Sequence, residues 1–206
     1  MTDFVRFHFD PLCPWCYQAS RWVRRLAELG EIRVDWAVFS LEIVNASSAE
    51  SAEKGHARSA SSLRTVIAVR DAEGADAVGR FYAALGAAVH QRGEAVDDRA
   101  TITAALVEAG LSPDLLDKAL ADDSTWTAVQ DEHRALVEGT RSFGVPTIVL
   151  DGGDGPAIFG PVISNPPTDA DAVELWRHVA WLTRYDNFSE LKRERTVQPD
   201  LPSFQH

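Results

Sequence analysis

The chain has 206 residues, a formal net charge of −11 and 45% hydrophobic residues. This length fits one domain, or one domain that carries a large insertion, and it is enough to bury a sizeable core. The acidic balance excludes a basic surface that recruits phosphates, so neither nucleic acid nor an anionic membrane is expected as a partner.

The N-terminal residues predict a strand and carry no targeting signal. The first ten residues contain no basic patch followed by an apolar run, and no apolar stretch is long enough to span a bilayer, which predicts a cytoplasmic protein. Val5, Phe7 and Phe9 alternate with the residues between them, so residues 4–9 have the period of a strand.

A helix is predicted to begin at Pro14, from which apolar residues recur every three or four positions until Gly30. Residues 31–38 alternate again and predict a second strand. A strand, a helix and a strand joined by short connections imply a parallel pair with a right-handed crossover. The start of the helix then lies at the carboxyl end of a strand, where open α/β sheets place their ligands.

The middle of the chain is predicted to be helical throughout. Apolar residues at helical spacing mark five segments, at residues 58–72, 76–91, 99–109, 113–121 and 125–139. Asp98, Ser112 and Ser124 are the expected N-caps of the last three.

The C-terminal part returns to strands and then to one helix. Residues 144–160 hold two short apolar runs around a Gly-Asp-rich turn, which predicts a hairpin. Residues 169–185 have helical spacing, and residues 198–206, with two prolines, are expected to form a loose tail.

This order of elements predicts an α/β protein with a thioredoxin-like fold and an inserted all-helical domain. The thioredoxin-like domain is expected at residues 1–45 and 140–197, and the insertion at residues 46–139. The last helix of that range either belongs to the insertion or returns to the thioredoxin-like part.

The only two cysteines of the chain, Cys13 and Cys16, form a C-P-W-C motif at the predicted helix start. Such a pair serves as a redox dithiol, as half of a zinc site, or as two packed thiols. A zinc site needs four ligands or three and water, and the sequence has no second cysteine pair and no paired histidines, so no metal is expected. Deep burial is not expected for a side chain that precedes the first helical turn, so the redox interpretation is favoured.

The position of the motif explains its chemistry. The free N–H groups and the dipole of the first helical turn stabilise a thiolate on Cys13 and lower its pKa from about 8.5 toward roughly 3.5–7.5. Pro14 suits the first helical position because its missing N–H is not needed there. Cys13 is therefore expected to attack, and Cys16, one turn further on, to resolve. Val145-Pro146 precedes a strand of the hairpin, where a redox thioredoxin fold places a cis proline; an ordinary trans proline is the alternative.

Seven short stretches of the sequence resemble one family. The stretches FDPLCPWCY, SRW, SLEIVN, YAALGAAVHQRG, GVPTIVLDG, IFGPVIS and ELKRERT are similar to the DsbA-like actinobacterial proteins described as mycothiol-dependent nitroreductases. The resemblance implies a cytosolic enzyme that takes electrons from the small thiol mycothiol and passes them to disulfides or nitroaromatic compounds. Cys13 would form the mixed disulfide and Cys16 would resolve it.

The resemblance also implies a substrate pocket between the thioredoxin-like part and the insertion. Trp15 and Asn45 would line it, although Trp15 also fits a surface aromatic and Asn45 a turn after the strand. Tyr17 stands where the family commonly has tryptophan and Val145 where it has threonine, and His56 stands near the place of a missing pocket tyrosine. These departures leave the electron acceptor open.

Two other classes of function remain open at this point. Isomerases and kappa-class transferases of the same fold activate one small thiol without a resolving cysteine, and the intact pair counts against them. A redox sensor or chaperone-like binding module would use the dithiol without turnover. His90, at the end of a predicted helix, is expected to be structural rather than catalytic. No nucleotide is expected, because no helix closely follows the glycines of DGGDG.

Overall fold

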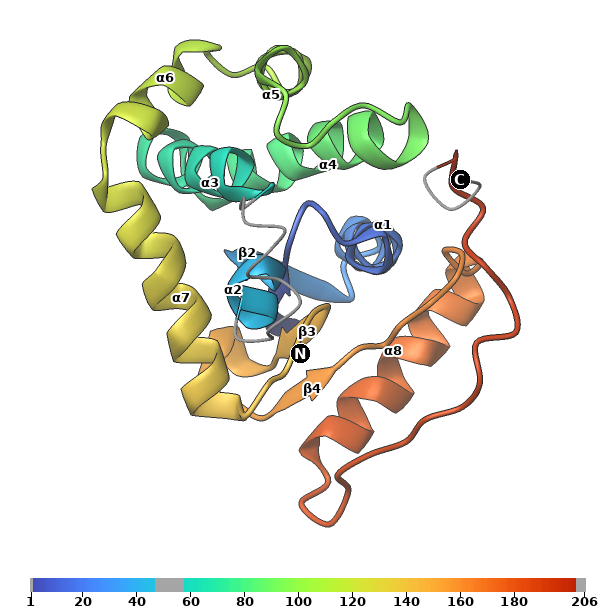
Figure 1. The fold of residues 1–206 in the computed structure, drawn as a ribbon. Helices are drawn as coiled ribbons and strands as arrows, with labels where there is room; N and C mark the ends of the chain where they lie inside the picture. Colours follow the sequence, from blue (N-terminus) through green and yellow to red (C-terminus); the bar gives the residue numbers. More distant parts are fainter. Residues whose placement is uncertain (1, 47–57, 203–206) are drawn as a thin grey trace.

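A four-stranded mixed sheet forms the centre of the protein in the computed structural model, which describes residues 2–46 and 58–202 (Figure 1). The strand order is β2-β1-β3-β4. The strands are β1 (Asp3–Phe9), β2 (Ile32–Val38), β3 (Thr147–Val149) and β4 (Ala157–Phe159). Strand β1 pairs with β2 in parallel and with β3 antiparallel, and β3 pairs with β4 antiparallel.

The predicted strand-helix-strand unit is confirmed. Helix α1 (Pro14–Glu28) connects β1 to β2, and the parallel register runs from the Asp3–Ile32 pair to the Phe9–Val38 pair. The alternating side chains of β1, Val5, Phe7 and Phe9, are each 0% exposed. This burial fixes the register of β1, because a slip by one residue would bring its polar side chains into the core.

The predicted C-terminal hairpin and helix are also confirmed. The turn between β3 and β4 holds Asp151, Gly152 and Gly153 at φ values of 53°, 73° and 108°, a left-handed conformation that glycine adopts easily. Helix α8 (Asp169–Arg184) packs against α1, where the Trp22 indole N–H donates to the carbonyl oxygen of Ala172 at 3.1 Å. The start of α8 is capped by the Thr168 hydroxyl, which accepts from the N–H of Asp171.

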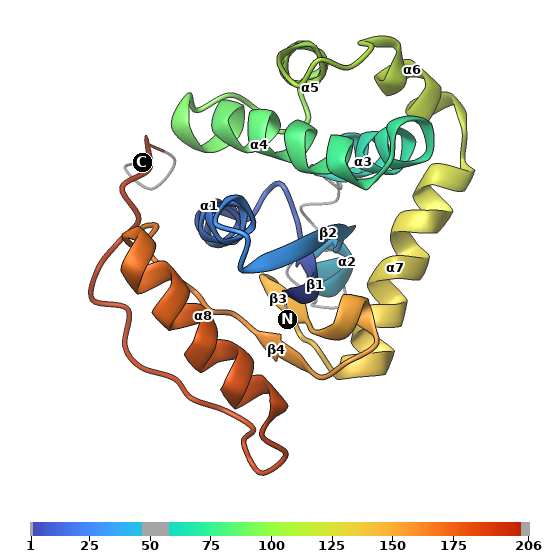
Figure 2. The same cartoon turned by 180° about the vertical axis from the view of Figure 1, so that it is seen from behind.

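Six helices lie between β2 and β3 in the described part of the chain. They are α2 (Leu41–Ala46), α3 (Ala60–Glu73), α4 (Ala75–Gln91), α5 (Arg99–Glu108), α6 (Asp114–Ala121) and α7 (Ser124–Thr140). Figures 1 and 2 show α3 to α6 gathered on one side of the sheet, with α7 running from them back toward β3. Helix α2 was not predicted, because six residues give too little periodicity to distinguish a helix from the end of a strand.

The cap of α5 agrees with the prediction, and those of α6 and α7 differ from it. The Asp98 carboxylate accepts from the N–H of Thr101. Helix α6 has Pro113 at its N-cap. The predicted cap, Ser112, lies one position before it, and its hydroxyl accepts from the N–H of Asp114. Ser124 is itself the first residue of α7, and its N–H donates to the carboxylate of Asp122 at 2.9 Å.

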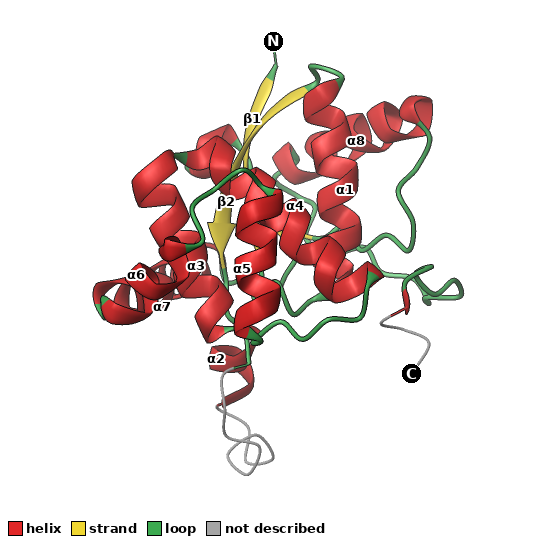
Figure 3. Cartoon of the chain, turned by 90° about the horizontal axis from the view of Figure 1, so that it is seen from above, coloured by secondary structure: helices red, strands yellow, loops and turns green. Residues whose placement is uncertain are grey.

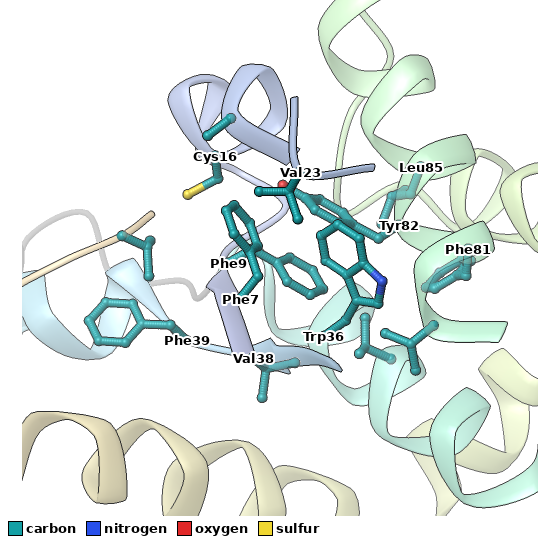
Figure 4. Packing of buried hydrophobic residues seen from close by; sticks show 14 of the residues in the cluster. Phe7, Phe9, Cys16, Val23, Trp36, Val38, Phe39, Phe81, Tyr82 and Leu85 are labelled. Atoms are coloured by element: carbon teal, nitrogen blue, oxygen red, sulfur yellow. The ribbon is translucent and has the colours of Figure 1, made fainter. Parts of the chain in front are cut away.

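Two glycines allow α4 to lie close to the sheet and to α1. A Cβ atom on Gly79 would lie 2.7 Å from the indole nitrogen of Trp36, and one on Gly86 would lie 2.4 Å from the ring of Tyr17. Tyr82 on the same helix stacks on Phe9 with ring centroids 3.7 Å apart (Figure 4). Helix α4 is therefore part of the central core.

Helix α7 also contacts the sheet. The Glu132 carboxylate accepts from the N–H of Val38 at 3.0 Å, and His133 Nδ1 accepts from the N–H of Ser40 at 3.3 Å. The last helix of the predicted insertion thus packs on β2, whereas the domain limits at residues 45 and 140 stay a prediction.

Part of the predicted loose tail is packed. Pro199 is buried and Leu201 is 1% exposed. The N–H of Asp200 donates to the side-chain oxygen of Asn165 at 3.2 Å. Residues 203–206 of the tail lie outside the described residues.

Candidate active site

The two cysteines lie at the carboxyl end of β1, where the chain enters α1. Cys13 is the N-cap of α1 in an extended conformation (φ −87°, ψ 110°), and Pro14 is the first helical residue. The Cys13 sulfur accepts from the N–H of Cys16 at 3.3 Å, and its carbonyl oxygen accepts from the N–H of Tyr17 at 3.1 Å. The two thiols are unbonded, as in a reduced dithiol. Figure 3, in which the molecule is seen from above, shows that β2 points to the side of the molecule on which α2 lies.

The two thiols differ in exposure and in pKa. The pKa of Cys13 is lowered, first by the hydrogen bond from the Cys16 thiol and then by the N–H groups of Cys16 and Trp15, against the effect of burial. The pKa of Cys16 is raised well above its ordinary value, chiefly by burial. Cys13 is 6% exposed, and Cys16 is 0% exposed and belongs to the core drawn in Figure 4. This difference favours Cys13 over Cys16 as the nucleophile, and the roles of the two sulfurs stay a prediction.

The Val145-Pro146 peptide bond is cis, as predicted. The Cys13 sulfur lies 3.8 Å from the carbonyl oxygen of Val145, which brings the hairpin against the dithiol. Deep burial was not expected for Cys13, because it precedes the first helical turn. The side chain is nevertheless buried, because the Val145 loop packs on it. The carbonyl oxygen of Pro146 accepts from the N–H of Gly160 at 2.8 Å, so the end of β4 supports this loop. A second cis bond, Gly160-Pro161, follows directly.

Asp10 is a site residue that the sequence reasoning missed. Its carboxylate is 0% exposed and accepts from three donors: the N–H of Leu12 at 2.8 Å, the N–H of Leu41 at 2.8 Å and the hydroxyl of Ser59 at 3.2 Å. Burial raises the pKa of this carboxyl from 3.8 to about 6, and its negative charge raises the pKa of both cysteines. In the sequence, Asp10 only marks the end of a strand.

His90 was expected to act as a structural cation at a helix end, but the structure buries it as a neutral ring that contacts the loop of the dithiol. The carbonyl oxygen of Pro11 accepts from His90 Nε2 at 2.9 Å, so α4 holds the loop that carries Cys13. Burial lowers the pKa of this histidine from 6.5 to about 4, so the ring is neutral at physiological pH. The same ring stacks on Tyr17 with centroids 5.3 Å apart.

The predicted substrate-binding residues are placed differently from one another. Trp15 is half-buried next to the dithiol, and the Arg195 guanidinium carbon lies 5.0 Å from the centroid of its ring. Tyr17 is 4% exposed and packs against α4, and Asn45 is exposed near the end of α2. His56 lies outside the described residues. The substrate contacts of these four residues stay a prediction.

Two aromatic rings in segments that adjoin the cis proline lie next to each other. Phe143 is 70% exposed, and its ring centroid lies 4.6 Å from that of the half-buried Phe159. Phe143 precedes Val145 by two residues, and Phe159 precedes Gly160, whose N–H binds Pro146. The pair forms an apolar surface beside the loop that contacts Cys13.

Within residues 2–46 and 58–202, no three histidine, cysteine, aspartate or glutamate side chains are grouped to hold a metal ion. In the same part of the chain, no helix has the length and apolar character needed to cross a membrane.

Comparison with known proteins agrees with this geometry. A family model described as "Rv2466c-like: Mycothiol-dependent nitroreductase Rv2466c" matches residues 12–193. The uncharacterized protein Rv2286c of Mycobacterium tuberculosis is 35% identical over 195 residues, which cover 93% of this chain and 82% of that protein.

Two solved structures show the same fold. The cytosolic disulfide reductase DsbM from Pseudomonas aeruginosa has a TM-score of 0.62 at 16% identity, covering 87% of this chain and 99% of that one. A 2-hydroxychromene-2-carboxylate isomerase has a TM-score of 0.64 at 17% identity, covering 88% of this chain and 96% of that one. The thioredoxin-like fold predicted from the order of elements, and its DsbA-like character implied by the resemblance, are confirmed.

Proposed function

Because the chain belongs to the Rv2466c-like family of thiol-disulfide oxidoreductases, we propose that it uses mycothiol to reduce disulfides or nitroaromatic compounds through a mixed disulfide on Cys13. The observation that carries the proposal is the asymmetry of the dithiol. Cys13 is the more exposed sulfur and has a lowered pKa, whereas Cys16 is fully buried and has a raised pKa. This difference supports an order of reaction in which Cys13 attacks first.

The reduction of a disulfide proceeds in two exchanges. The Cys13 thiolate attacks one sulfur of the acceptor, the acceptor disulfide breaks, and its first half leaves as a thiolate. The Cys16 thiol then loses its proton and attacks the Cys13 sulfur, so the second half leaves and a Cys13–Cys16 disulfide forms. The acceptor gains two electrons and the dithiol loses them.

The dithiol is regenerated by two molecules of a small thiol. The first attacks the Cys13 sulfur and frees Cys16, and the second releases Cys13 as the two small thiols become one disulfide. The residues present fit such a reaction, because Cys13 is the more exposed member of the pair and the N–H groups of Cys16 and Trp15 stabilise its thiolate each time it leaves. With a nitroaromatic acceptor, the same two electrons reduce the nitro group to nitroso and water.

Asp10 is positioned to assist the second exchange. Its pKa of about 6 makes it a carboxylate at neutral pH, in a buried site where its charge acts on Cys16. A buried base with a pKa near the working pH can take a proton and return it. The proposal therefore includes Asp10 as the group that takes up the Cys16 proton, on the ground that its charge raises the pKa of Cys16.

The surfaces around Cys13 suit an aromatic or apolar acceptor. Trp15 lies two positions after Cys13 and is half-buried, and the Phe143 and Phe159 rings lie next to each other in segments that adjoin the cis proline. A cytoplasmic location fits this proposal, because a small-thiol pool keeps the dithiol reduced there. The structurally similar DsbM is itself described as cytosolic.

The test is the mass of the intact protein after exposure to oxidised mycothiol. Cys16→Ser is expected to trap one mycothiol on Cys13, and Cys13→Ser to trap none. The doubly substituted chain is the matched blank, because the sequence contains no other cysteine. If Cys16→Ser forms no mycothiol adduct while it does react with a general disulfide, the mycothiol assignment is wrong and the dithiol serves another reductant.

A further inference from the structure

The ring of Trp15 contacts an arginine from the C-terminal part of the chain. The C-terminal strap, residues 190–202, follows α8 and returns along the outside of the molecule (Figures 1 and 2). It places the Arg195 guanidinium carbon 5.0 Å from the centroid of the Trp15 ring. Arginine over an indole face is a favourable cation–π contact.

Three contacts hold the strap next to this arginine. The Ser164 hydroxyl donates to the carbonyl oxygen of Val197 at 2.6 Å, the N–H of Asp200 donates to Asn165, and Leu201 is buried. The segment that receives the strap is itself tied to α1, because the Gln18 side chain donates to the carbonyl oxygen of Ser164 at 2.7 Å. The helix that begins at the dithiol thus also fixes the strap that carries Arg195.

The guanidinium of Arg195 has a hydrogen-bonding edge whose geometry suits an anionic ligand. Stacking uses the flat face of the group, while its N–H donors project from the edge in a planar fork that matches a carboxylate. Among residues 2–46 and 58–202, no carboxylate forms an ion pair with Arg195. The chain has a net charge of −11. Arg195 nevertheless places a positive charge next to Trp15, which follows Cys13 by two positions.

We infer that Arg195, held on Trp15 by the C-terminal strap, is a specificity-determining residue that favours acceptors carrying an anionic group beside their aromatic ring. The inference rests on the proposed reduction of acceptors by the dithiol. The anionic group pairs with the edge of the guanidinium while the reacting sulfur or nitro group faces Cys13. Neutral acceptors of the same shape lack this contact.

Two aromatic disulfides test the inference without mycothiol. The probes are 5,5′-dithiobis(2-nitrobenzoate), which carries a carboxylate on each ring, and 4,4′-dithiodipyridine, which is uncharged. The full chain is reduced with dithiothreitol, freed of excess reductant and mixed with each probe at one pH. In each reaction Cys13 and Cys16 lose two electrons and become a disulfide, and the probe gains them and leaves as two halves. These are thionitrobenzoate thiolates from the first probe and 4-thiopyridone, which takes up the thiol protons, from the second.

Arg195→Ala is expected to slow the reaction with the anionic probe about fivefold, the upper range for an exposed ion pair, and that with the neutral probe less than about twofold. Arg195→Lys keeps the positive charge but lacks the planar fork of donors. Its rate with the anionic probe is expected to lie between the rates of Arg195→Ala and of the unsubstituted chain. Arg193→Ala is the matched control, because it removes one positive charge from the same strap without the Trp15 contact. It is expected to leave the ratio of the two rates unchanged.

Two results would overturn the inference. Equal slowing of both probes in Arg195→Ala would mean that the arginine affects the thiols or the strap and not the choice of acceptor. The same change of ratio in Arg193→Ala would assign the effect to net charge. If the unsubstituted chain reacts with neither probe, the proposed oxidoreductase function fails as well. This outcome is distinct from one in which both probes react and only the ratio of their rates is unaffected by Arg195→Ala.

Discussion

Replacing Asp10 by asparagine should change how stability depends on pH. The fully buried carboxyl has a pKa raised from 3.8 to about 6, with burial as the main cause. The unfolded chain therefore releases this proton at lower pH than the folded chain does. Between these two pKa values the folded state binds the extra proton, so the free energy of unfolding falls as the pH rises.

The size of the change follows from the shift. A difference of about 2 in pKa corresponds to about 3 kcal/mol at about 1.36 kcal/mol for each unit. The asparagine amide does not titrate, so the stability of Asp10→Asn relative to the unsubstituted chain should improve by about 3 kcal/mol as the pH rises from about 3 to about 7. Asparagine also leaves one N–H donor of Leu12 or Leu41 unpaired, which costs about 1–3 kcal/mol at every pH and so does not affect the slope.

Urea unfolding at several pH values, followed by the fluorescence of the six tryptophans, measures this difference. Asp98→Asn is the control, because the exposed Asp98 caps α5 and its hydrogen bonds to Thr101 lower its pKa. A lowered pKa has the opposite sign: Asp98 stabilises the fold above its unfolded pKa, and that stability is lost as the pH falls through its folded pKa. Parallel stability curves for Asp10→Asn and the unsubstituted chain would refute the reasoning.

Three further changes follow from packing and from the thiol environment. Gly86→Ala should lower stability by about 1–3 kcal/mol in urea unfolding, because its Cβ would meet the Tyr17 ring at 2.4 Å, whereas Gly139→Ala, with no atom within 4 Å, should not. Cys16→Ala should raise the pKa of Cys13, since the Cys16 thiol is the main group that lowers it; an unchanged pH profile of alkylation would contradict this cause. Phe143→Ser should reduce kcat/KM for an apolar peptide disulfide about threefold and leave unfolding unchanged, because the ring is 70% exposed. Equal turnover by both proteins would remove Phe143 from the acceptor surface.

The fold could be predicted from periodicity, since its main elements carry clear signals. Val5, Phe7 and Phe9 alternate because β1 has one face in the core, and the helical segments repeat every three or four residues. Such local patterns identify an element without locating its neighbours. The short α2 was missed because its six residues show no full repeat.

The reacting sulfurs and the cis proline could be predicted, but their surroundings could not. Cys13, Cys16 and Pro146 belong to local motifs whose chemistry depends on their position at a helix start or before a strand. Asp10 contacts Leu41 and Ser59, which are 31 and 49 residues away in the chain. No periodicity or spacing connects groups that are brought together by tertiary packing alone.

The arrangement around Asp10 explains how a strongly acidic chain keeps a carboxylate and a thiolate in one buried site. Three helix starts converge there: Cys13 caps α1, Leu41 is the first residue of α2, and Ser59 is the N-cap of α3. Helix starts present free N–H groups and the positive end of the helix dipole. The N–H of Leu41 donates to Asp10 from such a start, and the N–H of Cys16 donates to the Cys13 sulfur, whereas Ser59 donates its side-chain hydroxyl. Backbone N–H groups, two of them at helix starts, therefore oppose the effect of burial on the pKa of Asp10 and of Cys13.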